Sequence, residues 1–253
     1  MVDLTIAIST FEERICNLIN WEFDQRLDYL IVWQNPSNFS FDATIFPNNV
    51  ELVCISTYGV ASSRNFALRY CKTSWIWFMD DDVNIPNESI NILIHSLPAF
   101  DESNILIASV NFGHKIPIKR FAVKSKSIFS VTSVGTIQII CSPKTALESK
   151  SFFPENMGAG SKYPVCDEPV FLLRMIRNAQ VYLCGIKDVI VEHPPVSSGI
   201  NLSKSENLIS RAMFFKEAFG FPLCLFVSSC FFVKHCKKIK WKFLYLYYFI
   251  SPN

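Results

Sequence analysis

The stretch that decides the fold reads Trp75-Ile76-Trp77-Phe78-Met79-Asp80-Asp81-Asp82. Five consecutive apolar residues without polar alternation are typical of a β-strand that is buried on both faces, as in a parallel sheet covered by helices. The apolar run stops at three adjacent carboxylates. Because ligands of open α/β sheets bind outside the carboxyl ends of the strands, the stretch predicts an α/β fold with an acidic site at one edge of its sheet.

The three carboxylates require compensation. Adjacent negative charges repel one another, so their position after a buried strand costs stability unless a cation or hydrogen bonds offset it. Residues two apart in an extended chain point to the same side, so we expect Asp80 and Asp82 to share one face while Asp81 points elsewhere. Carboxylate oxygens suit Mg²⁺ or Mn²⁺, particularly beside a diphosphate. A divalent metal is the simplest compensation, and a solvated acidic turn is the alternative.

The rest of the chain alternates strand-like and helix-like segments. Before the acidic stretch, strand patterns cover residues 4–9, 29–33 and 50–55, and helical patterns cover 15–19 and 61–70. Alternation of this kind favours parallel pairing of the strands. After the acidic stretch, strands are expected at 105–110, 130–141, 181–183 and 189–191, and a helix at 168–177. The prediction is a mixed, mainly parallel sheet flanked by helices.

Composition limits the classes of partner. A chain of 253 residues accommodates one sizeable domain, and its net charge of +2 leaves no broad basic field, so no nucleic acid is expected to bind. The nine cysteines form no CxxC pair and have no zinc-like spacing, which indicates reduced thiols in the cytoplasm. A hydrophobic fraction of 50% is high, so some apolar surface is expected to meet lipid or a partner protein.

The C-terminal part, residues 201–253, differs from residues 1–200. Residues 218–233 are strongly apolar but contain Pro222 and fall short of the ~20 clean residues that span a bilayer. Lysines then cluster between residues 234 and 242, and residues 243–250 are aromatic. Apolar insertion together with lysines suits an anionic membrane surface. We therefore expect a helical tail at the inner face of the cell membrane; packing on the domain or on another subunit is the alternative.

Two further features lie after the acidic stretch. The pair Asp167-Glu168 precedes the helix at 168–177, and a carboxylate at a helix N-terminus can serve simply as a cap. His193 follows the last strand pattern, and neutral imidazole is a competent metal ligand. Gly158 and Gly160 indicate either a close approach of the backbone to a ligand or a plain turn.

Four segments together resemble the family 2 glycosyltransferases of the GT-A (Rossmann-like) fold, from the first strand to about His193. They are Ile8-Ser9-Thr10-Phe11-Glu12-Glu13-Arg14, the segment 59–65 with its Ser-Arg-Asn, the segment 77–83 around the three aspartates, and 166–172 leading to 191–193. The resemblance implies a metal-dependent, inverting transferase. Such an enzyme moves a hexosyl group from a nucleotide-diphosphate sugar to a hydroxyl of a glycan or lipid-linked glycan, here in cell-surface polysaccharide synthesis such as capsule or O-antigen.

The resemblance also implies roles for the donor-binding residues. Thr10, Glu12 and Arg64 would line the nucleotide pocket, although Glu12 and Arg64 could instead form a structural ion pair. Asp80 would contact the nucleoside of the donor, with Asp81 beside it. Asp82 would bind the Mn²⁺ or Mg²⁺ that bridges the leaving diphosphate.

For the transfer step, the resemblance implies that Glu168 is the general base and that Asp167 orients it or helps to bind the acceptor. The order Asp-Glu departs from the family's usual Glu-Asp, so the roles of the two are interchangeable at this stage. His193 would join Asp80 and Asp82 at the metal.

Two other functions stay open, a nucleotidylyltransferase and a binding subunit without activity, while a phosphatase is disfavoured. A nucleotidylyltransferase has a similar fold, but it begins with a glycine-rich phosphate loop where this chain has Ser9-Thr10-Phe11-Glu12. A phosphatase of the haloacid dehalogenase type is disfavoured because the later Gly-Asp-x-x-x-Asp motif is missing. The alternative outside enzymes is a catalytically silent, membrane-bound binding subunit.

Overall fold

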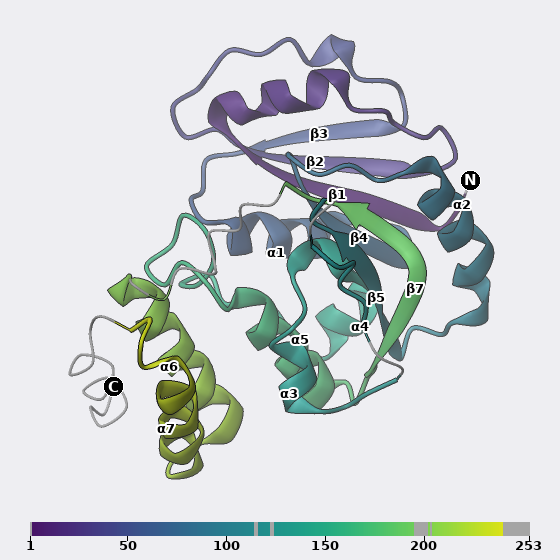
Figure 1. Ribbon diagram of the computed structural model, residues 1–253. Helices are drawn as coiled ribbons and strands as arrows, with labels where there is room; N and C mark the ends of the chain where they lie inside the picture. Colours follow the sequence, from purple (N-terminus) through teal and green to yellow (C-terminus); the bar gives the residue numbers. More distant parts are fainter. Residues whose placement is uncertain (1, 114–115, 122–123, 195–201, 203, 240–253) are drawn as a thin grey trace.

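The computed structural model describes residues 2–113, 116–121, 124–194, 202 and 204–239, and it has helices on both faces of a seven-stranded sheet (Figure 1). The strands lie in the order β3-β2-β1-β4-β6-β5-β7. Their bounds are β1 Leu4–Phe11, β2 Asp28–Gln34, β3 Val50–Ile55, β4 Trp75–Asp80, β5 Asn104–Asn111, β6 Ile139–Cys141 and β7 Tyr182–Glu192. The α-helices are α1 Val60–Tyr70, α2 Asn87–Ser96, α3 Ile128–Val131, α4 Pro143–Glu148, α5 Asp167–Asn178, α6 Ser205–Phe219 and α7 Leu223–His235. Short 3₁₀ helices are η1 Glu12–Asn20, η2 Ala43–Ile45, η3 Leu97–Ala99 and η4 Thr136–Gln138.

The sheet is mixed and mainly parallel, as predicted. Strand β1 pairs in parallel with β2 and β4, β3 extends this half, and β7 is parallel to β5, whereas the short β6 is antiparallel to both of its neighbours. Ser9 is paired with Asp80, so β1 and β4 end at the same edge of the sheet. The residues that follow these two strands are therefore brought together there.

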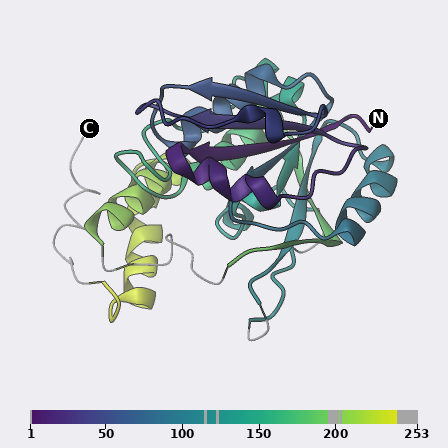
Figure 2. The same ribbon diagram turned by 90° about the horizontal axis from the view of Figure 1, so that it is seen from above.

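The apolar run of β4 is buried on both faces, as predicted. Ile76 and Phe78 belong to the core under α1, α4, α5 and α6, while Trp77 and Met79 belong to the core under η1 and α2. In Figure 2 the helices α6 and α7 lie at one end of the molecule and α2 at the opposite end. This two-sided burial explains why the strand has no polar alternation.

Two local predictions were wrong, and a third differs in the type of helix. The segment 130–141 is a strand only at 139–141, because Ser127 caps α3 and the Gln138 side chain closes a turn onto the backbone of Gly135. The two short strands expected at 181–183 and 189–191 are one strand, β7, which bulges where Ser109 Oγ donates to the carbonyl of Lys187. The helix expected at 15–19 is the 3₁₀ helix η1.

The C-terminal helices pack against α5. Leu208, Phe214 and Ala218 of α6 are buried in the same core as the helix α5, and Arg177 of α5 donates to the carbonyl of Glu217. The predicted boundary at residue 200 and the aromatic segment 243–250 lie outside the described residues. Within the described part of the chain, none of the helices combines the length and the apolar character needed to cross a bilayer.

Two phenylalanines test whether α6 belongs to the core of the domain. Phe214 is 2% exposed and Phe226, on α7, is 67% exposed. We expect Phe214→Ala to lower the free energy of unfolding by about 3–5 kcal/mol, because it leaves a cavity in the core. The matched variant Phe226→Ala should change it by less than ~0.5 kcal/mol. Chemical denaturation measures both, and equal midpoints would show that α6 is not part of this core.

Candidate active site

A cavity of about 820 Å³ opens at the carboxyl edge of the sheet. It is lined by most of the predicted site residues: Thr10, Arg64, Asp80, Asp81, Asp82, Asp167, Glu168 and His193. They come from the ends of β1, β4 and β7 and from the helices α1 and α5. Glu12 is the exception, since it does not line the cavity and instead accepts a hydrogen bond from Trp33 Nε1 with its backbone carbonyl (2.9 Å).

The three aspartates after β4 divide into two sets. Asp81 is buried, its Oδ2 accepts from Thr10 Oγ1 (2.6 Å), and its two carboxylate oxygens accept from the guanidinium of Arg14. Asp80 and Asp82 contribute instead to a cluster with His193, in which one ligand atom of each residue lies within 4.8 Å of the others. This division follows the alternation of side chains along an extended chain.

His193 reaches the cluster because the end of β7 is tied to the segment after Asp82. The backbones of Asn84 and Glu192 exchange two hydrogen bonds (3.0 and 2.9 Å), and Asn84 Nδ2 donates to Glu192 Oε2 (2.9 Å). His193 Nδ1 contacts the carbonyl of Pro194. Because a carbonyl only accepts, a neutral His193 ring in this position would carry its proton on Nδ1 and have on Nε2 the lone pair that a metal needs.

The donor set fits a divalent cation. Two carboxylates and an imidazole are suitable ligands for Mn²⁺, and the carboxylates also suit Mg²⁺. Burial raises the pKa of Asp80 above its ordinary value, Arg64 opposes this shift, and the charges of Asp82 and Glu168 add to it. A cation between Asp80 and Asp82 would relieve this repulsion, so the residues present match the metal that the sequence predicts.

Arg64 connects the acidic cluster to the helix α5. Arg64 is 4% exposed; its Nη2 donates to Asp80 Oδ1 (3.2 Å), its Nη1 donates to Asp167 Oδ2, and Glu168 Oε1 lies 3.8 Å from Nη1. The ion pair considered for Glu12 and Arg64 is therefore wrong, because the guanidinium pairs with the partly exposed Asp80 and the buried Asp167 instead. One arginine thus holds carboxylates that are more than eighty residues apart in the sequence.

The acidic pair at α5 has two different environments. The carboxylate of Asp167 is 3% exposed, and burial, together with the charge of Glu168, raises its pKa while Arg64 opposes the shift. The side chain of Glu168 is 23% exposed and its Oε1 accepts from Thr136 Oγ1 (2.7 Å). The N-cap position belongs to Cys166, which makes no side-chain capping bond. Neither carboxylate is the capping residue that a simple structural role would require.

Gly158 allows the backbone to lie directly against Asp167. A Cβ atom at this position, where φ is +91°, would lie 2.7 Å from Asp167 Cγ. The approach predicted from Gly158 is therefore to a side chain of the site. Gly160 packs with its neighbour Gly59 at the start of α1, where a Cβ would come within 3.4 Å of the Gly59 backbone.

Several residues of the cavity had no role in the sequence prediction. Arg14 belongs to the segment 8–14 and Tyr58 precedes the segment 59–65, whereas Lys119 and Arg211 come from segments without a motif. Thr136 is not a lining residue, but it donates to Glu168, which lines the cavity. Burial lowers the pKa of the Lys119 ammonium and the charge of Glu168 opposes that shift. Arg14 lies in the segment 8–14 that carries the resemblance, so the sequence offers a signal for its contact with Asp81. No local signal marks Thr136 or Arg211.

The contact between Gly158 and Asp167 predicts an unequal response to alanine. Gly113 is the matched control, since its φ is +99° and a Cβ there would meet nothing within 4 Å. We expect Gly113→Ala to cost about 1–2 kcal/mol of unfolding free energy through backbone strain alone. Gly158→Ala should cost about 2 kcal/mol more, because the methyl group must displace the Asp167 carboxylate. Urea denaturation of both variants measures the difference, and equal losses would contradict the contact.

Residues 46–135 match the model of glycosyl transferase family 2. A comparison with curated protein sequences found no match. Among solved structures, TarS of S. aureus superposes with a TM-score of 0.56 at 16% identity, covering 94% of this chain and 44% of that one. TarS 1-349 in complex with UDP-GlcNAc gives 0.58 at 16%, with 85% and 66% covered.

A mannosyltransferase of Pyrobaculum calidifontis, PcManGT, in complex with GDP-Man and Mn²⁺, gives a TM-score of 0.54 at 14% identity, with 86% of this chain and 64% of that chain covered. The chain thus spans less than two thirds of the length of these structures. The likeness to them establishes the fold. That fold is the GT-A fold, and within it residues 46–135 are similar to glycosyl transferase family 2.

Proposed function

We propose that this protein is a metal-dependent, inverting glycosyltransferase that moves a sugar from a nucleotide-diphosphate sugar to a hydroxyl of an acceptor glycan. The observation that carries the proposal is the joint lining of one cavity by the Asp80, Asp82 and His193 cluster and by Glu168. A metal site alone would serve many functions. A metal site that shares a cavity with a partly exposed carboxylate provides both a place for a diphosphate and a group that removes a proton.

The different environments of the two acidic residues of α5 support Glu168 as the base. Asp167 is buried and bound to Arg64, so it acts as a positioning residue. Glu168 is partly exposed to the cavity, and the Thr136 hydroxyl fixes its orientation. A base must reach the hydroxyl from which it removes the proton, and only the partly exposed carboxylate meets this condition.

In the proposed reaction, Glu168 accepts the proton of the acceptor hydroxyl. The hydroxyl oxygen forms a bond to the anomeric carbon of the donor sugar, and the bond from that carbon to the diphosphate oxygen breaks with its electron pair on the nucleoside diphosphate. A divalent cation held by Asp80, Asp82 and His193 would neutralise the charge on this leaving group. Because attack and departure are on opposite faces, one displacement inverts the anomeric centre.

The solved relatives support a nucleotide sugar as the donor. One is a complex with UDP-GlcNAc, and another is a complex with GDP-Man and Mn²⁺. In this chain Phe11 and Tyr58 line the cavity with ring centroids 6.1 Å apart, and Tyr58 is 66% exposed. Aromatic rings at the mouth of a cavity provide a surface on which the base of a nucleotide stacks.

The C-terminal helices support association with the anionic inner face of the cell membrane. The acceptor there would be a lipid-linked glycan for a cell-surface polysaccharide. Leu223, Phe226, Cys230 and Val233 are exposed on α7 at the spacing of one helical face. Lys234, Lys237 and Lys238 follow directly and are exposed. Apolar side chains that enter lipid and cations that meet anionic headgroups are the two components of interfacial binding.

Thermal stabilisation by nucleotides tests the metal and donor site. Addition of Mn²⁺ with one of UDP, GDP, CDP or dTDP at about 100 times its dissociation constant should stabilise the protein by about 2.7 kcal/mol, and EDTA should remove the effect. Asp82→Asn should lose this stabilisation because it removes a ligand charge. Glu168→Gln is the matched control, since it should keep nucleotide binding and lose sugar transfer.

The outcomes separate the alternative functions. A folded protein that no nucleotide stabilises would contradict the donor site and favour a catalytically silent binding subunit. Release of pyrophosphate from a nucleoside triphosphate would indicate a nucleotidylyltransferase, since a glycosyltransferase releases a nucleoside diphosphate.

Sedimentation with vesicles of phosphatidylserine and phosphatidylcholine tests the membrane proposal. Deleting the whole segment from residue 218 would expose the core, because Ala218 is buried, so point variants are preferable. Phe226→Glu should weaken vesicle binding at least tenfold, since a buried Phe contributes about 1.5–3 kcal/mol. Ile45→Glu, at a 48% exposed residue of η2, is the control and should bind as the unmodified chain does. Equal binding of all three proteins would refute the proposal.

A further inference from the structure

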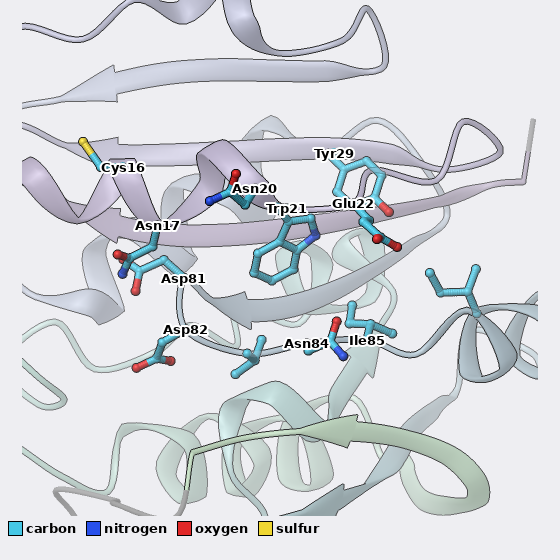
Figure 3. Close-up of a pocket in the computed structure, with 12 residues that line it drawn as sticks. Cys16, Asn17, Asn20, Trp21, Glu22, Tyr29, Asp81, Asp82, Asn84 and Ile85 are labelled. Atoms are coloured by element: carbon cyan, nitrogen blue, oxygen red, sulfur yellow. The ribbon is translucent and has the colours of Figure 1, made fainter.

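A second cavity, of about 670 Å³, shares only Asp81 and Asp82 with the active-site cavity. Figure 3 shows that it lies between η1, with the residues that follow it, and the segment after β4. It is lined by Cys16, Asn17, Asn20, Trp21, Glu22, Tyr29, Asp81, Asp82, Val83, Asn84, Ile85 and Ile90. The roles assigned above use none of these residues except the two shared aspartates and Asn84, which ties β7 to this segment.

The lining of the second cavity is largely polar, and no Lys or Arg belongs to it in the part of the chain that the structure describes. The amides of Asn17, Asn20 and Asn84 both donate and accept hydrogen bonds, and Glu22 accepts them. The charged lining residues, Glu22, Asp81 and Asp82, are all acidic. A phosphate or carboxylate ligand would meet only like charge there, so the cavity selects an uncharged ligand with many hydroxyl groups.

Trp21 adds an aromatic surface to these polar groups. It is half-buried beside the cavity, and its ring stacks on Phe23 with centroids 6.5 Å apart and an interplanar angle of 28°. The other tryptophans in the described part of the chain, Trp33, Trp75 and Trp77, are all buried. The apolar C–H face of a pyranose ring packs on an indole while the hydroxyls at its rim bond to amides and carboxylates.

We propose that the second cavity is a subsite for uncharged sugar residues of the acceptor glycan. Asp82 lines both cavities and its side chain is 42% exposed, so a glycan bound beside Trp21 lies against the wall of the active site. The assignment to the acceptor rests on the proposed glycosyltransferase function. The binding of a neutral glycan at Trp21 does not, and it can be measured without turnover.

The test measures binding of neutral tetrasaccharides to the full chain by tryptophan fluorescence and calorimetry. The probes are cellotetraose, maltotetraose, mannotetraose and chitotetraose, with tetragalacturonate as the acidic counterpart of a neutral glycan. We expect one or more neutral probes to bind, tetragalacturonate to bind at least tenfold more weakly, and Trp21→Ala to weaken the neutral probe at least tenfold. Trp21→Phe should retain part of the affinity, since it keeps an aromatic surface.

Matched variants distinguish this site from the active site. Asn20→Ala should weaken the tetrasaccharide, whereas Asn91→Ala, at an exposed amide of α2 outside the cavity, should not. Trp21→Ala should keep the stabilisation by nucleotide and Mn²⁺, and Glu168→Gln should keep tetrasaccharide binding. If no neutral probe binds, or if binding survives in Trp21→Ala, or if tetragalacturonate binds as tightly as the neutral probes, the subsite is refuted. If the protein binds the tetrasaccharide but no nucleotide, the proposed function is refuted and the glycan site is not.

Discussion

The guanidinium of Arg64 is the constraint on which the active site depends. It is buried between Asp80, at the end of β4, and Asp167, at the start of α5, so it fixes the distance between the cluster of Asp80, Asp82 and His193 and the helix that carries Glu168. Removing one partner of a buried pair of this kind costs about 3–5 kcal/mol, because it leaves an unpaired charge in the interior. The position of α5 against the sheet is therefore an electrostatic requirement as well as a matter of apolar packing.

The acidic stretch after β4 is stable because its three charges have different partners. Asp81 is compensated by Thr10 and Arg14, and Asp80 by Arg64, whereas the contact of Asp82 among the described residues is an exposed one with Arg14 at 3.3 Å. Asp82, whose charge the described residues compensate least, thus lies in the cluster with His193. This distribution of charge supports the proposal that Asp82 binds a divalent cation together with Asp80 and His193.

Much of the fold follows from local patterns, and much of the site does not. The buried strand at 75–79 and the helices α1 and α5 were predictable because their apolar patterns agree with the residues that begin and end each element. Residues 130–141 were misread because their β-branched composition resembles a strand, while Ser127 and the Gln138 side chain impose turns. Thr136 orients Glu168 from 32 residues away, and only the tertiary fold brings them together.

The distribution of cations separates the two cavities on either side of Asp81 and Asp82. The active-site cavity is lined by Arg14, Arg64, Lys119 and Arg211, whereas none of the described residues that line the second cavity is Lys or Arg. A ligand that carries a diphosphate is therefore favoured on one side of this wall and repelled on the other. Since Arg14 contacts both aspartates, the wall itself is held from the cationic side. Under the proposed assignments, the diphosphate of the donor would lie on the cationic side of this wall and the uncharged acceptor on the other side, with Asp82 between them.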